Sequence, residues 1–330
     1  MTGPLLEIED LKTYYVGDQG RRVTKAVDGV SLALGAGETL GIVGESGSGK
    51  TTLALSLLRL LPPAGRIVGG AIRFEGEDLL GKSAREMRRI RGKRIAMILQ
   101  DPMASLNPLF TVGDQVAEPL RVHEGANRRA ARERARELLR SVRIAAPEIR
   151  VKEYPHQMSG GMRQRIVGAI AISCEPRLLI ADEPTTSLDL TIQAQYLGLL
   201  RELQRRHRLA LIFVTHNLGI VARMCDRVAV MYAGRVVENG PVRAIFDAPA
   251  HPYTQALVES IPRLGDARGR LTAIDGQPPD LAALPAGCAF HPRCPRVFER
   301  CRQETPPALS AGPAHTARCW LLDPRPSVGA

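Results

Sequence analysis

A glycine-rich run between an expected strand and an expected helix constrains this chain more than any other feature. Residues 44–51 read GESGSGKT and fit the pattern G-x-x-x-x-G-K-[ST]. The apolar run Thr39–Val43 before it is typical of a buried strand, and residues 50–61 after it have a helical pattern that Pro62 and Pro63 should end. Glycines let backbone N–H groups curl around a polyphosphate, and the helix N-terminus adds partial positive charge. The run therefore predicts a phosphate-binding loop in an α/β fold.

Two side chains of this loop and two acidic residues elsewhere have predicted roles at the phosphates. Lys50 would reach the β- and γ-phosphates of a nucleotide, and the Thr51 hydroxyl would ligate Mg²⁺. The apolar run Leu178–Ala181 leads directly into Asp182 and Glu183. Ligands bind at the carboxyl ends of strands in open α/β sheets. Asp182 is therefore expected to serve Mg²⁺, and Glu183 to orient and deprotonate the attacking water.

The organisation of the chain changes near residue 250. Before that point strand-like runs alternate with helical patterns, which indicates a largely parallel sheet. Strands are predicted at 95–99, 178–181, 209–215 and 228–232, with a hairpin from the last to 235–238. Between Gln100 and Cys174 the strand signal disappears, which predicts a helical insertion. The last 80 residues hold 12 of the 24 prolines and four of the six cysteines, so they should not build an independent core.

The net charge of +11 is concentrated in two segments. Arg85–Arg94 and Arg121–Arg143 each carry a net +5, and neither contains an aromatic residue. A solvated helix face, attraction to anionic lipid and nucleic-acid binding all remain open, although single-strand binders interleave basic residues with aromatic stacking platforms. No apolar run is long enough to span a bilayer, and the acidic start of the chain does not resemble a signal peptide. A soluble cytosolic protein is expected.

Four further motifs identify a family. Besides the phosphate loop and the acidic pair, the chain has Gln100 after a strand, His216 at the end of another, Met158-Ser159-Gly160-Gly161-Met162 opening a helix, and Ser187-Leu188-Asp189. With every motif in this order over residues 5 to about 250, the chain resembles the ATP-binding subunit of an ABC transporter. The resemblance implies a P-loop ABC ATPase of the α/β class, with a RecA-like core, an antiparallel β subdomain and an inserted helical subdomain. The expected domains are an ABC nucleotide-binding domain at 1–250, with its helical subdomain at about 101–175, and a C-terminal domain at 251–330.

The resemblance also implies how two such domains work together. They would pair head to tail, with each ATP between the phosphate loop of one and the Ser159 helix of the other. Glu183 would be the general base, His216 would contact the γ-phosphate, and Gln100 would sense Mg²⁺ and water. The adenine would stack on Tyr15, or on the neighbouring Tyr14. The implied nucleotide contacts are Tyr15, Gly44, Glu45, Ser46, Gly47, Ser48, Gly49, Lys50, Thr51, Thr52, Ser159, Gly160, Gly161 and Asp189, the last also signalling across the dimer.

One residue departs from the family pattern. The commonest signature ends in Gln where this chain has Met162, which cannot donate a hydrogen bond. Met at this position is familiar in peptide-importer subunits, so the resemblance does not imply loss of activity.

Four cysteines in the C-terminal segment suggest that it is held together by a metal. Cys288, Cys294, Cys301 and Cys319 are spaced C-x5-C-x6-C-x17-C. A disulfide framework is not expected in the cytosol, zinc sites show short C-x2-4-C pairs that are absent here, and wide spacing suits a cubane whose four irons each take one thiolate. Zinc and free thiols remain alternatives, and His291 or His315 could replace one thiol. Cys174 and Cys225 are expected to be buried core residues.

Three local sequences narrow the resemblance to oligopeptide and dipeptide importers. These are residues 100–108, residues 191–195 and His251-Pro252-Tyr253-Thr254. Some members of that subfamily carry a [4Fe-4S] cluster on four such cysteines. If the cluster only braces the extension here, replacing Cys294 should leave the phosphate-loop chemistry intact.

The function implied is an ATPase that powers import of small peptides. Its expected partners are two transmembrane permease subunits, a second ABC ATPase subunit in a heterodimer and an extracytoplasmic peptide-binding protein, with no nucleic acid. The expected location is peripheral, on the cytoplasmic face of the inner membrane. A nucleic-acid ABC ATPase is the rival, but the 58 residues between Gln100 and Ser159 leave no room for a long coiled coil. A third hypothesis is a binding module in which ATP only switches the conformation. The presence of Glu183 and His216, the residues expected to act in hydrolysis, argues against it.

Overall fold

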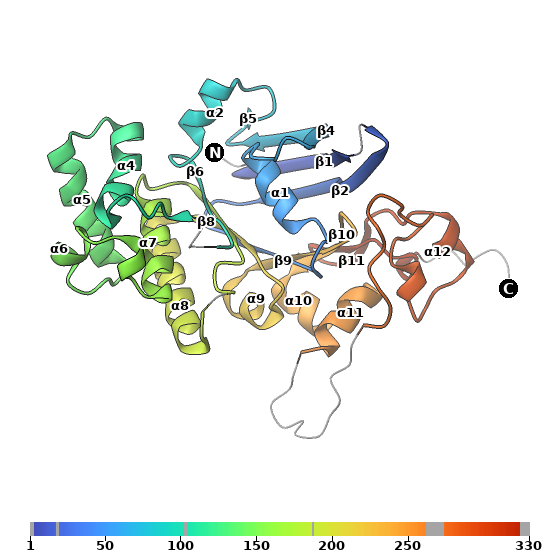
Figure 1. Ribbon diagram of the computed structural model, residues 1–330. Coiled ribbons are helices and arrows are strands. Elements are labelled where there is room, and N and C mark those ends of the chain that lie inside the picture. Colours follow the sequence, from blue (N-terminus) through green and yellow to red (C-terminus); the bar gives the residue numbers. More distant parts are fainter. Residues whose placement is uncertain (1–2, 18–19, 102–104, 187, 262–273, 324–330) are drawn as a thin grey trace. The chain divides into compact units, whose positions relative to one another are not determined.

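The computed structural model describes residues 3–17, 20–101, 105–186, 188–261 and 274–323 (Figure 1). The motif residues Pro102, Met103, Ala104 and Ser187 lie outside this part of the chain. The described chain forms two compact units. The first comprises residues 1–34, 39–80 and 214–330, and the second comprises residues 35–38 and 81–213. Each unit is described by itself.

The first unit contains an antiparallel sheet with the order β2-β1-β4-β5. Its strands are β1 (Leu6–Gly17), β2 (Arg22–Leu34), β4 (Gly65–Phe74) and β5 (Glu77–Asp78). Apolar side chains alternate with exposed ones, and Leu11, Val27 and Ile72 are fully buried. This alternation is typical of an antiparallel sheet with one face on the core. The antiparallel β subdomain implied by the resemblance is present.

The same unit holds the strand and helix that flank the phosphate loop. All five residues of β3 (Thr39–Val43) are buried, and β3 runs parallel to β9 (Arg227–Tyr232). From β3 the strand order continues through β9, β10 (Arg235–Pro241) and β12 (His315–Ala317) to β11 (Leu309–Gly312). The helices are α1 (Lys50–Leu57), α9 (Leu218–Met224), α10 (Val242–Asp247), α11 (Pro252–Glu259) and α12 (Glu299–Gln303), with 3-10 turns η3 (His291–Arg293) and η4 (Trp320–Leu322).

The C-terminal extension belongs to the first unit. Strand β12 pairs antiparallel with β10, where Ala317 lies opposite Glu238, and β11 continues the sheet. Phe290 of the extension is buried against Tyr232 of β9, with ring centroids 5.2 Å apart. Figure 1 shows the C-terminal segment, which includes β11, beside β10. The described residues of the extension contribute to the core of the first unit.

The second unit combines short parallel strands with a group of helices. Strands β6 (Ile95–Ile98) and β7 (Leu178–Asp182) are parallel, and the order is β8-β7-β6 with β8 at Ala210–Val214. In Figure 1, helices α4 to α7 gather on one side of this unit. The helices are α2 (Ala84–Ile90), α4 (Val112–Glu124), α5 (Arg128–Ser141), α6 (Pro147–Arg150), α7 (Gly160–Ile172) and α8 (Leu190–His207), with the 3-10 turn η2 (Pro155–Gln157).

Most predicted elements are confirmed within a few residues. The described part of 100–174 contains helices and no strand, and the hairpin through Ala233-Gly234 joins β9 to β10. Cys174 and Cys225 are buried, as expected. One boundary is wrong: α1 ends at Leu57 rather than near Leu61. Arg59 has a left-handed backbone (φ 51°), which ends the helix before the prolines. None of the described helices is both long and apolar enough to cross a membrane.

Candidate functional site

The phosphate loop is built on two glycines that no other residue could replace. Gly44 has φ 153°, and a Cβ added there would lie 2.1 Å from the Met231 carbonyl oxygen. Gly49 has φ 100°, and its Cβ would lie 2.0 Å from the Ala26 carbonyl oxygen. Both positions therefore require glycine for backbone conformation and for close approach of neighbouring chain. The loop ends where Gly49 caps α1, so the first N–H groups of that helix face the expected phosphate site.

The ammonium group of Lys50 is held inside this loop. Its Nζ donates to the carbonyl oxygens of Gly44 at 2.8 Å and Glu45 at 2.9 Å, and the residue is only 6% exposed. Thr51 is exposed beside it at the first turn of α1. The loop thus presents a cation, a hydroxyl and a helix N-terminus together, which is the chemistry that binds polyphosphate.

The two candidate tyrosines for adenine differ in their contacts. The Tyr15 hydroxyl lies 3.2 Å from the Thr52 hydroxyl, which places Tyr15 beside the phosphate-loop helix. The Tyr14 hydroxyl instead donates to Asp28 at 2.7 Å, and Asp28 also accepts from Arg235. Burial, followed by this hydrogen bond, raises the pKa of Tyr14 to about 12. Tyr14 therefore belongs to a structural network, and Tyr15 is the candidate for the nucleotide.

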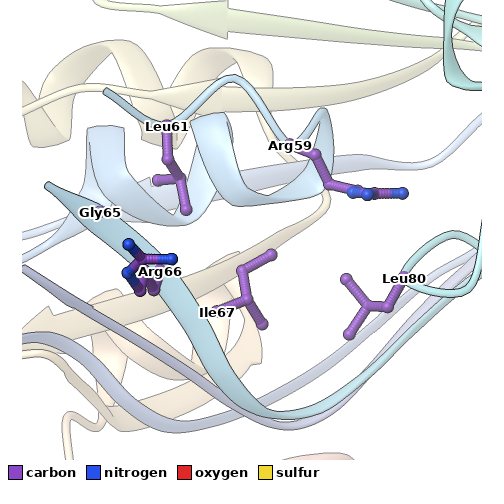
Figure 2. Close-up of a pocket in the computed structure, with 6 residues that line it drawn as sticks. All are labelled: Arg59, Leu61, Gly65, Arg66, Ile67 and Leu80. Carbon is purple, nitrogen blue, oxygen red and sulfur yellow. The ribbon is translucent and has the colours of Figure 1, made fainter. Parts of the chain in front are cut away.

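A pocket of 430 Å³ in the first unit is drawn in Figure 2, and one of its lining residues, Gly65, contacts Tyr15. Gly65 is the link, because a Cβ there would lie 2.9 Å from Cε1 of the Tyr15 ring. None of the lining residues belongs to the phosphate loop, so the pocket is separate from the expected phosphate site. It is lined by Arg59, Leu61, Gly65, Arg66, Ile67 and Leu80.

In the second unit, the acidic pair stands at the end of β7. Asp182 is the last residue of the strand and is 1% exposed. Glu183 follows with a left-handed backbone (φ 45°), an uncommon conformation for a non-glycine residue. Its Oε2 accepts from Gln100 Nε2 at 3.2 Å and from the Thr186 hydroxyl at 2.9 Å. The structure thus brings together Glu183 and Gln100, two residues to which the sequence assigned linked roles.

The two signature elements are helix caps. The Ser159 hydroxyl accepts from the backbone N–H of Met162 at the start of α7, and Ser159 and Gly160 are exposed. Asp189 Oδ1 accepts from the N–H groups of Thr191 and Ile192 at the start of α8. Both side chains therefore have a structural role in capping, beside any role at the nucleotide. His216 belongs to the first unit, follows β8 and is exposed.

A contact between the phosphate loop and the C-terminal extension was not predicted from the sequence. The Glu45 carboxylate is paired with Arg293, and the Glu45 backbone N–H donates to the Tyr253 hydroxyl at 2.8 Å. Tyr253 is fully buried and packs on Tyr232 and Phe290. Glu45 was expected only as a loop residue at the nucleotide. The extension is thus in direct contact with the loop, through Arg293 and Tyr253.

The four C-terminal cysteines line one pocket of the first unit. None forms a disulfide, and Cys301 and Cys319 are buried. Burial, with smaller contributions from the neighbouring cysteines, raises the pKa of Cys288 and of Cys319 to about 11. The pocket has a free volume of only 20 Å³, and no three His, Cys, Asp or Glu side chains of the described residues are placed to hold one metal ion.

The two histidines proposed as substitute ligands have different positions. His291 lines the cysteine pocket, with its Nδ1 lying 3.0 Å from the Cys288 carbonyl oxygen. His315 does not line that pocket. Its Nε2 lies 2.7 Å from the buried Glu238 carboxylate, where β12 pairs with β10. Because His315 is already engaged by Glu238, the suggestion that it substitutes for a thiol is wrong.

Comparison with known families matches two segments of the chain. Residues 27–186 match the family described as ABC transporter. Residues 237–301 match the family described as oligopeptide/dipeptide transporter, C-terminal region. The first match covers the phosphate loop, Ser159 and the acidic pair, and the second covers Tyr253, Arg293 and three of the four cysteines.

Full-length relatives agree with these matches. The probable peptide ABC transporter ATP-binding protein y4tR of Sinorhizobium fredii is 51% identical over 318 residues, which are 96% of this chain and 94% of the relative. The dipeptide transport ATP-binding protein DppD of Bacillus subtilis is 49% identical over 322 residues, 97% of this chain and 96% of the relative.

Solved structures match as well. A dimeric, post-hydrolysis structure of the ATP-binding cassette MJ0796 bound to ADP and Pi superposes with a TM-score of 0.64 at 26% identity. It covers 72% of this chain and 99% of that chain. With the identity of its relatives and the order of its motifs, this chain belongs to the ABC transporter ATP-binding proteins of the peptide-importer family.

Proposed function

We propose that this protein hydrolyses ATP to power the import of small peptides through a membrane ABC transporter. The observation that carries the proposal is the phosphate loop with Lys50 held inside it, in a chain whose full-length relatives are named as peptide import or transport ATP-binding proteins. Uptake of peptides by cells with an active or inactivated form of this chain tests the proposal.

Each candidate residue has a role that its position supports. Lys50 and the first N–H groups of α1 would bind the β- and γ-phosphates, and Thr51 and Asp182 would hold Mg²⁺, whose charge stabilises the phosphates. Glu183 would accept a proton from the attacking water, because its carboxylate is oriented by Gln100 and Thr186. His216 would contact the γ-phosphate, and Ser159 would contact that of a second subunit.

The proposed partners follow from the family to which the chain belongs. Two transmembrane permease subunits would carry the peptide, in keeping with relatives named as peptide and dipeptide transport ATP-binding proteins. A second ATPase subunit would complete the nucleotide sites, in keeping with the dimeric solved relative. A peptide-binding protein outside the membrane would select the solute. We place the protein on the cytoplasmic face of the inner membrane, attached through the permeases.

The distribution of charge favours this assembly over a nucleic-acid partner. Five of the eight arginines between Arg121 and Arg143 pair with carboxylates of the second unit. Such exposed pairs add little stability, but they offset the positive potential that a phosphate backbone would need. The paired residues are Arg132 with Asp114, Arg134 with Glu175, Arg136 with Glu133, Arg140 with Glu148 and Arg143 with Glu202.

Replacing Tyr15 tests the adenine site. Tyr15→Ala is expected to weaken ATP binding about fivefold, because a stacked ring contributes roughly 1 kcal/mol. Tyr15→Phe should bind ATP like the unmodified protein, since the ring remains. The matched control is Tyr14→Phe, which loses the bond to Asp28 and should change thermal stability without changing affinity. Calorimetric titration of the four proteins with MgATP measures this, and a larger loss of affinity for Tyr14→Phe than for Tyr15→Ala would reverse the assignment.

We further propose that the cysteine pocket holds a [4Fe-4S] cluster. Four free thiols line one pocket, with the apolar side chains of Phe290 and Trp320 beside them. The wide C-x5-C-x6-C-x17-C spacing, without the short C-x2-4-C pair that is usual for zinc, supports a cluster over zinc. Cys288, Cys294, Cys301 and Cys319 would hold the cluster, with one thiolate on each iron. Bound iron would keep the thiols deprotonated despite their raised pKa.

Metal analysis of protein purified without oxygen tests the cluster. We expect a brown protein with about four iron and four sulfide per chain. Cys294→Ser should lose most of the iron and expose the extension to protease, whereas Cys174→Ser, altered at a buried cysteine of the second unit, should keep its iron. Colourless protein that contains stoichiometric zinc would contradict the cluster, and so would equal iron in both variants.

A further inference from the structure

Arg293 joins the C-terminal extension to the phosphate loop through a paired contact with Glu45. Its Nη1 donates to Glu45 Oε2 at 2.7 Å, and its Nη2 donates to Oε1 at 3.0 Å. The Arg293 side chain is 4% exposed and that of Glu45 is 26% exposed. A two-bond contact between guanidinium and carboxylate fixes the orientation of both groups, and partial burial makes the contact stronger than a surface ion pair.

The remaining donors of Arg293 are also satisfied. Nε donates to the Asp275 carbonyl oxygen at 2.9 Å, Nη2 donates to the Ile274 carbonyl oxygen at 3.2 Å, and Nη1 donates to the Tyr232 hydroxyl at 3.3 Å. With the two bonds to Glu45 these use all five N–H groups of the guanidinium. Arg293 is therefore fixed by its surroundings, and it in turn fixes the carboxylate.

Glu45 is held at three points of its structure. Arg293 holds the carboxylate, the Tyr253 hydroxyl accepts from the backbone N–H, and Lys50 donates to the backbone carbonyl oxygen. Tyr253 and Arg293 both belong to the extension. The extension thus contacts the residue that follows Gly44, at the start of the loop.

A carboxylate in a phosphate-binding loop carries an electrostatic cost. The negative charge of Glu45 would repel a polyphosphate bound to the same loop, and the repulsion would be strong where water is partly excluded. A neighbouring guanidinium that donates two hydrogen bonds to the carboxylate offsets this charge. The pair leaves the loop near neutral on this side while Lys50 and the helix N-terminus supply the attraction.

We propose that Arg293 is a positioning residue for nucleotide binding, which acts through Glu45 by offsetting its charge and fixing its place in the loop. The proposal rests on the proposed function, since it assumes that ATP binds at this loop. It assigns the extension a part in ATP affinity, besides any metal that the cysteines hold. Arg293 immediately precedes Cys294, so the contact with Glu45 lies next to the cysteine pocket in the chain.

Calorimetric titration of the full-length protein with MgATP and with adenosine tests the proposal. Arg293→Ala is expected to weaken MgATP binding about tenfold and to leave adenosine binding unchanged, because only the phosphates meet the uncompensated charge. The loss should shrink in 1 M salt, where the Debye length is about 3 Å. Adding Glu45→Gln to Arg293→Ala should restore affinity to within about threefold, since the repelling charge is then gone.

Controls separate a positioning role from a structural one. Arg300→Ala breaks a comparable contact in the same extension, to Asp323 and Glu304, and should bind MgATP normally. Equal losses for ATP and adenosine, or no rescue by Glu45→Gln, would overturn the proposal. If Arg293→Ala does not fold, the single variant Glu45→Gln tests the proposal. In that variant the Arg293 guanidinium is no longer neutralised, so ATP binding should become tighter. Unchanged or weaker ATP binding would contradict the proposal. If Lys50→Ala also binds ATP normally, the proposed function fails instead.

Discussion

Replacing Lys50 with alanine is expected to weaken MgATP binding by about 100-fold, on the order of 3 kcal/mol, because two charge-assisted hydrogen bonds to phosphate are lost. The Lys50 ammonium is already placed inside the loop, bonded to the carbonyl oxygens of Gly44 and Glu45. A bound nucleotide would offer it phosphate oxygens in place of these carbonyls. Hydrolysis should fall at least as much as binding, and both can be measured on the purified full-length chain.

The control for Lys50→Ala is an exposed lysine away from the loop. Lys152 lies in the second unit after α6, and Lys152→Ala should bind MgATP like the unmodified protein. Lys50 also connects two backbone carbonyls of the loop, so the thermal stability of the Lys50→Ala protein must be measured in parallel. A fall in affinity that is matched by unfolding at the assay temperature would not count as support, and full affinity in a folded Lys50→Ala protein would contradict the assigned site.

Replacing Glu183 with glutamine should separate binding from turnover. Gln keeps the size of the side chain and can still bond to Gln100 and Thr186, so ATP should remain bound. It cannot accept the proton of the attacking water, so the hydrolysis rate should fall by roughly 10²- to 10⁴-fold. Affinity is measured by titration and turnover by phosphate release, and the expected result is a large loss in the second only.

Glu175 offers a matched control in the same unit. It also has a left-handed backbone (φ 50°, against 45° for Glu183), but its carboxylate pairs with Arg134 on the surface. Glu175→Gln should therefore hydrolyse ATP at the normal rate. An unchanged hydrolysis rate in Glu183→Gln would show that Glu183 is not the general base. Equal losses of hydrolysis in Glu183→Gln and Glu175→Gln would show that the loss is not specific to Glu183.

The sequence predicted the elements around the nucleotide site well because local chemistry determines them. The buried strand Thr39–Val43 reads as a continuous apolar run, and the glycines at 44 and 49 are required by close backbone contacts. The strand before Asp182 and the helical insertion were recognisable for the same reason. The antiparallel sheet was implied by the resemblance rather than by pattern, since β1, β2 and β4 contain shifts in register that blur their alternation.

Contacts between distant parts of the chain could not be predicted. Glu45 and Arg293 are 248 residues apart, and no local pattern links a loop glutamate to an arginine beside a cysteine. Two other roles also depended on contacts between residues distant in sequence. The Tyr14 hydroxyl donates to Asp28, and the His315 ring lies against the buried Glu238 carboxylate. The early end of α1 depended on one left-handed residue, Arg59, before the two prolines that marked the expected boundary.

Peptide uptake by the native host tests the central claim most directly. The chromosomal gene for this chain would be replaced by the Glu183→Gln form, with Glu175→Gln as the control strain. Cells would then receive a defined mixture of dipeptides to pentapeptides, whose disappearance from the medium is followed by mass spectrometry. The account predicts that some of these peptides are taken up by the control strain and not by the Glu183→Gln strain. Equal uptake of every peptide by both strains would contradict it.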